Sequence, residues 1–245
     1  MANGFDPRAT AAPHTAGTAG RESVAFDAGL RSHMLSVYNY MASAVLLTGI
    51  VAYGAAAAGI AQQIFLGAGI LKYVVLFAPL IMVFFLAARM NRMSTGGLQA
   101  FYWSFAVVMG LSMSLIPLLY SGTSIAATFF ATSAAFVSLS LWGYTTKKDL
   151  SGFGTFLMMG LVGLIVAMLV NLFLRSDAMS LAISAIGVLL FAGLTAYDTQ
   201  KIKSIYFQVA GTDMLGKAAI LGALNLYLDF INMFQFLLSF MGSRE

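Results

Sequence analysis

The sequence of 245 residues contains no cysteine and only two histidines, His14 and His33. The absence of cysteine excludes a disulfide framework, thiol catalysis and iron–sulfur ligation. Both histidines precede the first long apolar run, so a zinc or haem site inside a membrane is not expected either. Charged residues make up only 9% of the chain, whereas a soluble domain has about 25%. The basic residues are scattered and form no stripe for nucleic acid.

Apolar residues dominate what remains. Hydrophobic residues make up 60% of the chain and the mean hydropathy is +0.88, which indicates an integral membrane protein. Seven apolar runs are each near the length of about 20 residues that crosses a bilayer as a helix. They lie at about 35–58, 70–88, 98–119, 124–144, 154–174, 179–200 and 218–240. The sequence therefore predicts an all-α polytopic membrane protein with seven transmembrane helices.

The N-terminal segment has a different composition. Residues 1–30 are rich in Ala, Gly and Thr, with isolated charges and no apolar periodicity. We expect a disordered cytoplasmic tail there, followed by a seven-helix transmembrane domain over 31–245.

Loop charge predicts the orientation. If all seven runs cross the membrane, ten of the 13 basic residues fall on one side and three on the other. The ten are Arg8, Arg21, Arg31, Arg89, Arg92, Lys147, Lys148, Lys201, Lys203 and Lys217, and the three are Lys72, Arg175 and Arg244. Because cytoplasmic loops carry the excess of Lys and Arg, we expect the N-terminus in the cytoplasm and the C-terminus outside. The polar centre of the seventh run leaves a re-entrant segment as an alternative.

Two acidic residues lie inside the long apolar runs. Asp198 is near the end of the sixth run, and Asp229 is about eight to eleven residues into the seventh. An ionised Asp at the centre of a span costs about 2.5–3.5 kcal/mol on insertion scales, so such residues usually serve a function. The alternative is a structural role, either in a buried salt bridge or as a protonated hydrogen-bond donor.

The seventh run carries a polar stripe. Asn225, Asp229 and Asn232 stand at i, i+4 and i+7, on one face of a helix. Such a face should point to the bundle interior, so this helix is predicted to be central. Asn225 and Asn232, with Thr195 and Tyr197, are candidates for a polar shell around the acids. For the asparagines, hydrogen bonding between helices is an equal alternative, and for Thr195 and Tyr197 ordinary packing is favoured.

Asp198 and Asp229 are the candidate ion site if their depths match. Two carboxylates about 4 Å apart repel by about 4 kcal/mol at an effective dielectric constant of 20, so the pair is expected to share a proton. When fully ionised, such a pair can bind a hard cation through oxygen. Calcium fits this ligand set best, because softer metals favour cysteine and histidine. No cofactor is expected beyond calcium as a permeant or bound ion.

Three segments resemble one membrane protein family. Phe-Ala-Gly-Leu-Thr-Ala-Tyr-Asp-Thr-Gln-Lys-Ile-Lys at 191–203 is similar to the sixth-span motif of the Bax inhibitor family. Leu226-Tyr-Leu-Asp-Phe-Ile231 resembles that family's last span, and Arg89-Met-Asn-Arg-Met-Ser94 resembles the end of its second. The resemblance covers roughly 31–240. It implies a bacterial member, in the inner membrane, with seven helices and the last one central.

The resemblance also implies a function. Members of the family are pH-sensitive cation leaks, notably for calcium, in which two aspartates sense protons and plug the pore. These match Asp198 and Asp229, and the arginine that latches the closed state of bacterial members matches Arg89. For Arg92, and as an alternative for Arg89, the role is that of a flanking residue whose charge reaches the interface. The loop 204–217 is longer than in short members, and the second span has no acid.

Three other functions remain open. An intramembrane aspartyl protease also has Tyr-Asp on one span and an Asp on the next. Its second Asp follows Gly-x-Gly, however, whereas Asp229 follows Leu226-Tyr-Leu, so we expect no enzyme. A proton-coupled transporter would show repeated halves with broken helices, and no clear repeat is present. A non-conducting membrane regulator, with unknown protein partners, is the third.

Overall fold

The computed structural model describes residues 16–67 and 69–243, with side chains in 28–67, 69–90 and 92–243. The helices are α1 (Ala16–Ala57), α2 (Ile60–Phe65), α3 (Leu71–Arg89), the 3-10 turn η1 (Met90–Arg92), α4 (Thr95–Met113), α5 (Ile116–Leu119), α6 (Gly122–Thr145), α7 (Ser151–Leu174), α8 (Asp177–Val209) and α9 (Leu215–Met241). Within the described part there are seven spans long and apolar enough to cross a membrane. The predicted all-α fold with seven spans is therefore confirmed.

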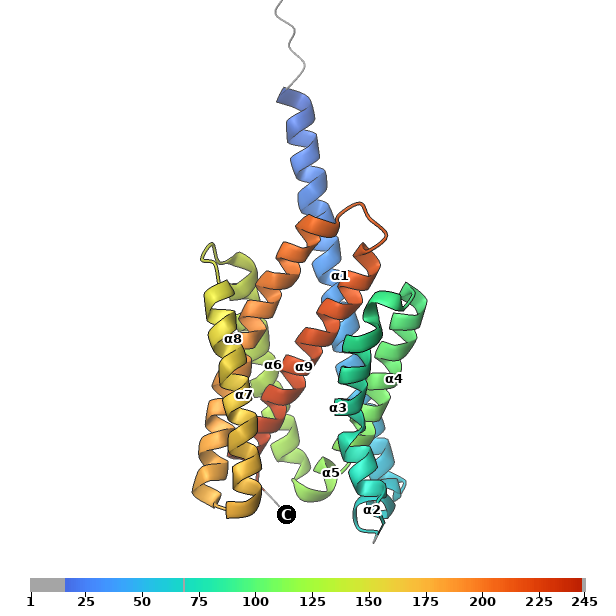
Figure 1. Cartoon of the computed structure of the whole chain (residues 1–245), viewed down its shortest axis with the longest axis vertical. Helices are drawn as coiled ribbons and strands as arrows, with labels where there is room; N and C mark the ends of the chain where they lie inside the picture. Colours follow the sequence, from blue (N-terminus) through green and yellow to red (C-terminus); the bar gives the residue numbers. More distant parts are fainter. Residues whose placement is uncertain (1–15, 68, 244–245) are drawn as a thin grey trace, which may run out of the picture.

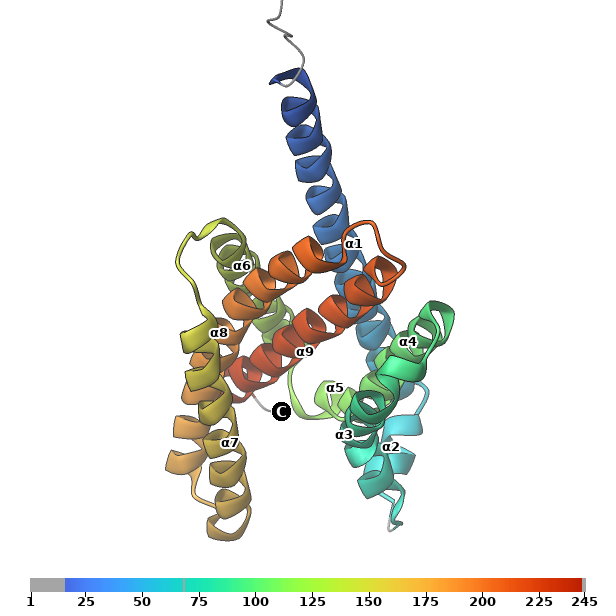
Figure 2. The same cartoon turned by 45° about the horizontal axis from the view of Figure 1, so that its top comes forward.

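Helix α9 lies at the centre of the bundle. It packs against α8, α1, α6 and α4, and it runs between the α6–α8 side and the α1–α4 side of the molecule (Figures 1 and 2). In its most apolar window 61% of the residues are buried, whereas no other span exceeds 39%. A helix exposed to lipid on few sides can carry polar groups, because neighbouring helices shield them. The central position predicted for the last span is confirmed.

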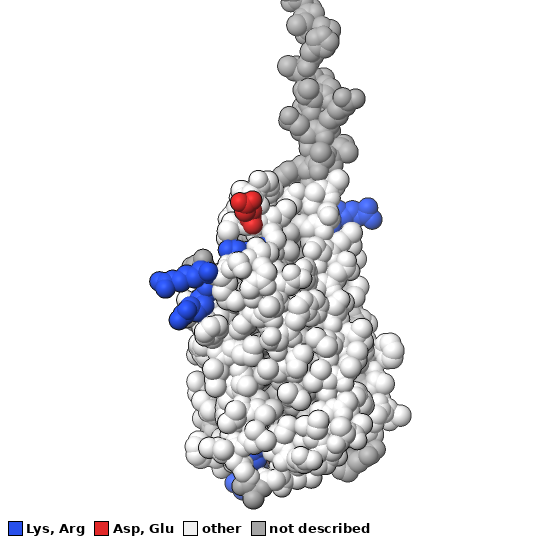
Figure 3. Space-filling model, turned by 90° about the vertical axis from the view of Figure 1, so that its right-hand side faces the viewer, with Lys and Arg blue, Asp and Glu red and all other residues white. Residues whose placement is uncertain are grey.

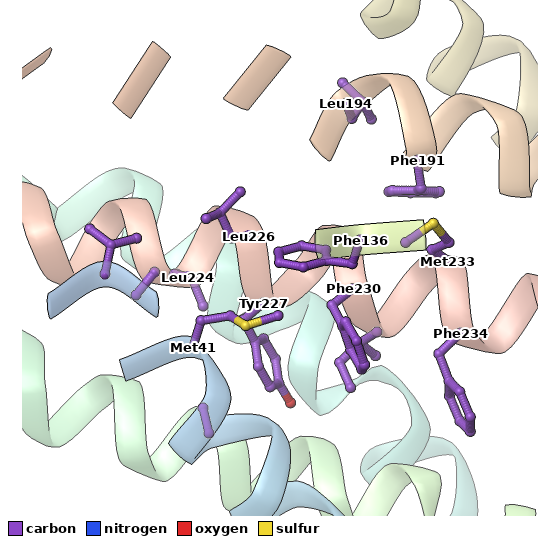
Figure 4. Packing of buried hydrophobic residues seen from close by; sticks show 14 of the residues in the cluster. Met41, Phe136, Phe191, Leu194, Leu224, Leu226, Tyr227, Phe230, Met233 and Phe234 are labelled. Carbon is purple, nitrogen blue, oxygen red and sulfur yellow. The ribbon is translucent and has the colours of Figure 1, made fainter. Parts of the chain in front are cut away.

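Aromatic side chains fill the space around α9. Phe230 lies edge-on to Phe136 and Phe129, with ring centroids 5.6 Å apart in both pairs. Tyr227 is fully buried on the same helix. Figure 4 shows Tyr227, Phe230 and Phe234 pointing away from the α8 side, where Phe191 lies. These edge-to-face contacts stabilise the bundle without hydrogen bonds.

The exposed charged side chains lie toward the two ends of the molecule. On the face drawn in Figure 3 an uncharged band separates them, as expected for a surface that contacts hydrocarbon. The α3–α4, α6–α7 and α8–α9 connections lie at the end where α1 enters, and α9 ends at the opposite end (Figure 1). Successive connections therefore lie at alternating ends of the bundle, as the count of basic residues on each side assumed. Which end faces the cytoplasm stays a prediction.

Helix ends differ from the predicted runs in three places. Helix α1 already begins at Ala16, so helix occupies the second half of the segment predicted to be disordered, and residues 1–15 lie outside the described part. The predicted run 98–119 divides into α4 and α5, with Pro117 in the first turn of α5. Helix α8 continues to Val209 instead of ending near residue 200.

The seventh span is a continuous helix. Helix α9 has 27 residues without a break, which at 1.5 Å per residue is about 40 Å and exceeds the hydrocarbon thickness. The re-entrant alternative is therefore not what the structure shows.

Candidate functional site: a carboxyl pair between the last two helices

The structure brings Asp198 and Asp229 together. Asp198 lies on α8 and Asp229 on α9, and the two carboxyl groups lie close enough to share a hydrogen bond. Asp198 is half-buried, and Asp229 is only 4% exposed. The pair thus lies at the interface of two adjacent helices, with Asp229 inside the bundle, as the sequence predicted.

The lengths of α8 and α9 bring the two acids to a similar depth in the bundle. Because α8 extends to Val209 and α9 begins at Leu215, Asp198 lies about three turns from the end of α8 and Asp229 about four turns from the start of α9. Close packing supports this alignment. The α8–α9 interface is the most extensive in the bundle, and a Cβ at Gly222 would lie 3.0 Å from the Ile202 side chain. Glycine at 222 lets the two backbones approach.

A hydrogen bond between two carboxyl groups requires a proton, since an ionised carboxylate only accepts. Two carboxyl groups this close suit a pair that shares one proton. The Oδ2 atom of Asp229 is buried and has no hydrogen-bond partner. A buried acceptor without a donor is costly. The site can lower that cost by taking up a proton, a water molecule or a cation.

The carboxyl pair does not by itself form a complete metal site. Among the described residues, no cluster of three or more acids, histidines or cysteines is suited to hold a metal ion. Calcium takes six to eight oxygen ligands, and two carboxylates supply at most about four. An ion at Asp198 and Asp229 would thus keep water or backbone carbonyls as ligands, which suits an ion that passes better than one that resides.

Two residues of the predicted polar shell donate hydrogen bonds to backbone carbonyls of their own helices. The Thr195 hydroxyl donates to the Phe191 carbonyl at 2.8 Å, and the Asn232 side-chain N–H donates to the Leu228 carbonyl at 2.7 Å. Such bonds satisfy a polar side chain in hydrocarbon without a partner helix. One of the two N–H groups of the Asn232 amide is therefore used within its own helix.

The two remaining shell candidates do not form a polar cage either. The Tyr197 ring packs against Gly154 of α7 and lies 5.8 Å from the Lys201 ammonium, which is the ordinary packing favoured for it. Asn225 is half-buried on α9, two turns before Asn232. The pair of acids, and not a larger polar cluster, is the chemical feature of this interface.

Arg89 does not contact the carboxyl pair in this structure. Its side chain is exposed at the end of α3, and the guanidinium lies over the Phe85 ring at 5.9 Å. Helix α3 packs mainly against α4 and makes no extensive contact with α8 or α9. The predicted ion pair with an aspartate is therefore absent here. Helix α3, which carries Arg89, packs on α4, and α4 and α9 separate it from α8.

A chain of hydroxyl groups close to Asp198 was not predicted. The Thr199 hydroxyl donates to the Thr195 carbonyl at 2.7 Å, and its oxygen lies 2.8 Å from Ser140 Oγ, which lies 2.6 Å from Tyr38 Oη. Since each hydroxyl has one proton, Ser140 donates to Thr199 and Tyr38 donates to Ser140. The chain links α1, α6 and α8 one residue after Asp198.

A second buried hydrogen-bond network fixes α9 two residues before Asp229. The Thr48 hydroxyl donates to the Ala106 carbonyl at 3.0 Å, so the Tyr227 hydroxyl, 2.7 Å away, donates to Thr48. This network joins α1, α4 and α9. Nothing in the sequence pairs these residues, because they are far apart along the chain.

His33 lies inside the bundle, although the sequence placed it before the first span. It is 5% exposed, its ring centroid is 5.4 Å from that of Tyr206, and its Nε2 has no hydrogen-bond partner. The difference arises because α1 begins before the apolar run that predicted it. His33 is a second buried group that can bind a proton.

A large hollow lies away from the carboxyl pair. It has a volume of about 1240 Å³ and lies between α1 and α6, with Phe230 and Phe234 of α9 among its lining residues. Most of its walls are apolar, and the Tyr38 and Ser140 hydroxyls are among its few polar groups. An apolar groove of this kind suits lipid chains, whereas the chemistry of a cation site lies at Asp198 and Asp229.

A membrane bundle of seven helices with an interior carboxyl pair on its last two spans is the class that this fold and site define. Residues 30–245 match the family model described as "Inhibitor of apoptosis-promoting Bax1". The chain belongs to this family, the Bax inhibitor family, as its motifs indicated.

Relatives match over nearly their whole length. Uncharacterized protein RP147 of Rickettsia prowazekii is 47% identical over 221 residues, which cover 90% of this chain and 93% of the relative. An uncharacterized protein of Caulobacter vibrioides is 45% identical over 236 residues, with 93% and 94% covered. The inner membrane protein YbhL of Escherichia coli K12 is 42% identical over 220 residues, with 89% and 94% covered.

Proposed function

We propose that this protein is a pH-sensitive cation leak whose permeant ion is calcium. The observation that carries the proposal is the close pair of carboxyl groups, Asp198 and Asp229, between the two helices with the most extensive contact. While the pair shares a proton it presents one negative charge and holds α8 to α9. Loss of that proton leaves two charges that repel by about 4 kcal/mol at 4 Å and an effective dielectric constant of 20. Protons and a hard cation then compete for the same oxygens.

Flux into liposomes tests this function against the enzyme alternative. Purified full-length protein is reconstituted with a calcium-sensitive dye inside, and calcium entry is measured across pH. We expect entry above that of protein-free liposomes, with a rate that changes near neutral pH because a shared proton titrates as a property of the pair. The same preparation is assayed for cleavage of transmembrane peptides. Cleavage without calcium entry would replace this proposal with a protease, and neither activity would favour a non-conducting regulator.

We further propose the same cellular location as that of the relative YbhL, whose name describes an inner membrane protein. The N-terminus then faces the cytoplasm, in line with the excess of basic residues at that end. The carboxyl pair lies nearer that end of the bundle, because Lys201 and Lys203 follow Asp198 within two turns. Cytoplasmic pH is the natural input to such a site.

Arg89 remains the proposed latch, but only in a state in which α3 has moved toward α8 or α9. In that state its fork would hold a carboxylate, since arginine is always charged. Replacing Arg89 with alanine is expected to raise resting calcium flux several-fold if the latch forms. Arg92→Ala is the control, because Arg92 is exposed in the adjoining turn η1. Wild-type flux in both variants would reduce Arg89 to an interfacial anchor stacked on Phe85.

A further inference from the structure

The connection between α6 and α7 is held against α8 by one side chain. The Gln200 side-chain N–H donates to the Lys148 carbonyl at 2.8 Å, and its oxygen accepts the Leu150 N–H at 2.9 Å. A single amide thus satisfies both a donor and an acceptor of the loop backbone. This clamp fixes the position of Lys147 and Lys148 relative to the next residue of α8, Lys201.

The clamp creates a basic pocket of about 310 Å³, which we name the lysine pocket. Its lining residues are Lys147, Lys148, Asp149, Ser151, Tyr197, Gln200, Lys201 and Ser204. Three lysines and one acid give it a formal net charge of +2. The Ser204 hydroxyl in its wall already donates to the Lys201 carbonyl at 2.8 Å, so the lysine ammonium groups are the donors that the pocket offers.

The one acid of the pocket is already engaged. Asp149 Oδ1 accepts the backbone N–H of Ser151 at 2.9 Å, and hydrogen bonds from the Ser151 side chain and backbone hold the pKa of Asp149 below its ordinary value. Asp149 is therefore ionised at neutral pH and is bound to the start of α7. Lys201 lies over the Tyr197 ring at 5.8 Å and interacts with the charge of Asp198, whereas Lys147 and Lys148 are exposed in the loop. Their charge is available to a ligand.

The pocket lies where the spans end. Helix α6 ends at Thr145 and α7 begins at Ser151, so the pocket lies at the level at which long lysine side chains reach from hydrocarbon to headgroups. The first turn of α7 adds the positive end of a helix dipole. In the first two turns of α7, Phe153 and Phe156 are 43% and 66% exposed, and their rings stack with centroids 6.4 Å apart. Acyl chains can pack on these rings.

We propose that the lysine pocket binds the phosphate-bearing headgroup of an anionic membrane lipid. The ammonium groups donate to the phosphate oxygens, and the net positive charge disfavours a headgroup that carries its own ammonium. Free phosphate shares this chemistry, but a lipid also gains the contact of its chains with Phe153 and Phe156. The bound headgroup would join the α6–α7 connection to α8 three residues from Asp198.

Lipid titration of the purified full chain tests the site. Binding of phosphatidylglycerol, phosphatidylcholine and inorganic phosphate is measured by native mass spectrometry, for wild type and for the triple variant Lys147→Gln, Lys148→Gln, Lys201→Gln. Each lysine near an anionic lipid headgroup strengthens binding several-fold. Loss of all three should therefore weaken phosphatidylglycerol binding roughly 100-fold. Phosphatidylcholine and inorganic phosphate should bind weakly to both proteins.

The matched control removes three charges at the same end but outside the pocket. The triple variant Arg31→Gln, Arg92→Gln, Lys217→Gln should retain wild-type phosphatidylglycerol binding, because none of these residues lines the lysine pocket. Equal losses in both triple variants would mean a diffuse surface charge and overturn the site. Inorganic phosphate that binds as tightly as the lipid would overturn the lipid as ligand. Equal unfolding midpoints without lipid exclude loss of fold as the cause.

Discussion

Replacing Asp229 with asparagine is expected to abolish the pH dependence of calcium flux. An asparagine amide can donate to the Asp198 carboxylate without a titrating proton, so the contact between α8 and α9 persists at every pH. The ratio of the flux at about pH 6 to that at about pH 8 should fall to near one, because no shared proton remains. The measurement is dye-reported calcium entry into liposomes across pH, made on Asp229→Asn and Asp198→Asn separately.

A matched control distinguishes the pair from acidity in general. Asp213 is exposed in the connection between α8 and α9 at the same end of the molecule, so Asp213→Asn should keep the pH dependence of the wild type. If Asp198→Asn and Asp229→Asn also keep it, the proton sensor lies elsewhere. His33 would then be the next candidate, since it is buried against Tyr206 and its Nε2 has no hydrogen-bond partner.

The carboxyl pair was predictable because hydrocarbon tolerates few ionisable groups. Asp198 and Asp229 are the only acids within long apolar runs, and a cost of a few kcal/mol for each makes their burial informative. The central position of α9 followed from the same principle, since its polar stripe needs shielding. Length and composition were sufficient for seven spans, because each run must satisfy its own backbone as a helix.

The direction in which a side chain points was harder to predict. The end of a span gives the depth of Arg89, but its contacts depend on the rotation of α3 and on the helix that packs beside it. The link from Tyr38 through Ser140 to Thr199 joins residues 102 and 59 positions apart, so no local pattern encodes it. Helix ends were missed where helix continues past the apolar run, as in α8 to Val209.

Replacing Gly143 with alanine is expected to destabilise the bundle. A Cβ at position 143 of α6 would overlap the backbone carbonyl of Ala196 in α8. Backbone cannot rotate away as a side chain can, so α6 and α8 must separate. Overpacking of this kind costs about 1–3 kcal/mol, and it outweighs the gain of up to about 1 kcal/mol from replacing a helical glycine with alanine. The unfolding midpoint in detergent should fall by several degrees.

The same substitution should also disturb the carboxyl pair, because Ala196 lies two residues before Asp198 on α8. Gly163→Ala in α7 is the matched control, since a Cβ there meets nothing within 4 Å and the helix propensity of alanine should leave the midpoint unchanged or higher. We expect Gly143→Ala to change the pH dependence of calcium flux and Gly163→Ala to leave it as in the wild type. A Gly143→Ala protein as stable as Gly163→Ala would mean that α6 and α8 do not approach this closely. A destabilised Gly143→Ala protein with the wild-type pH dependence would mean that the position of α8 against α6 does not set the geometry of Asp198 and Asp229.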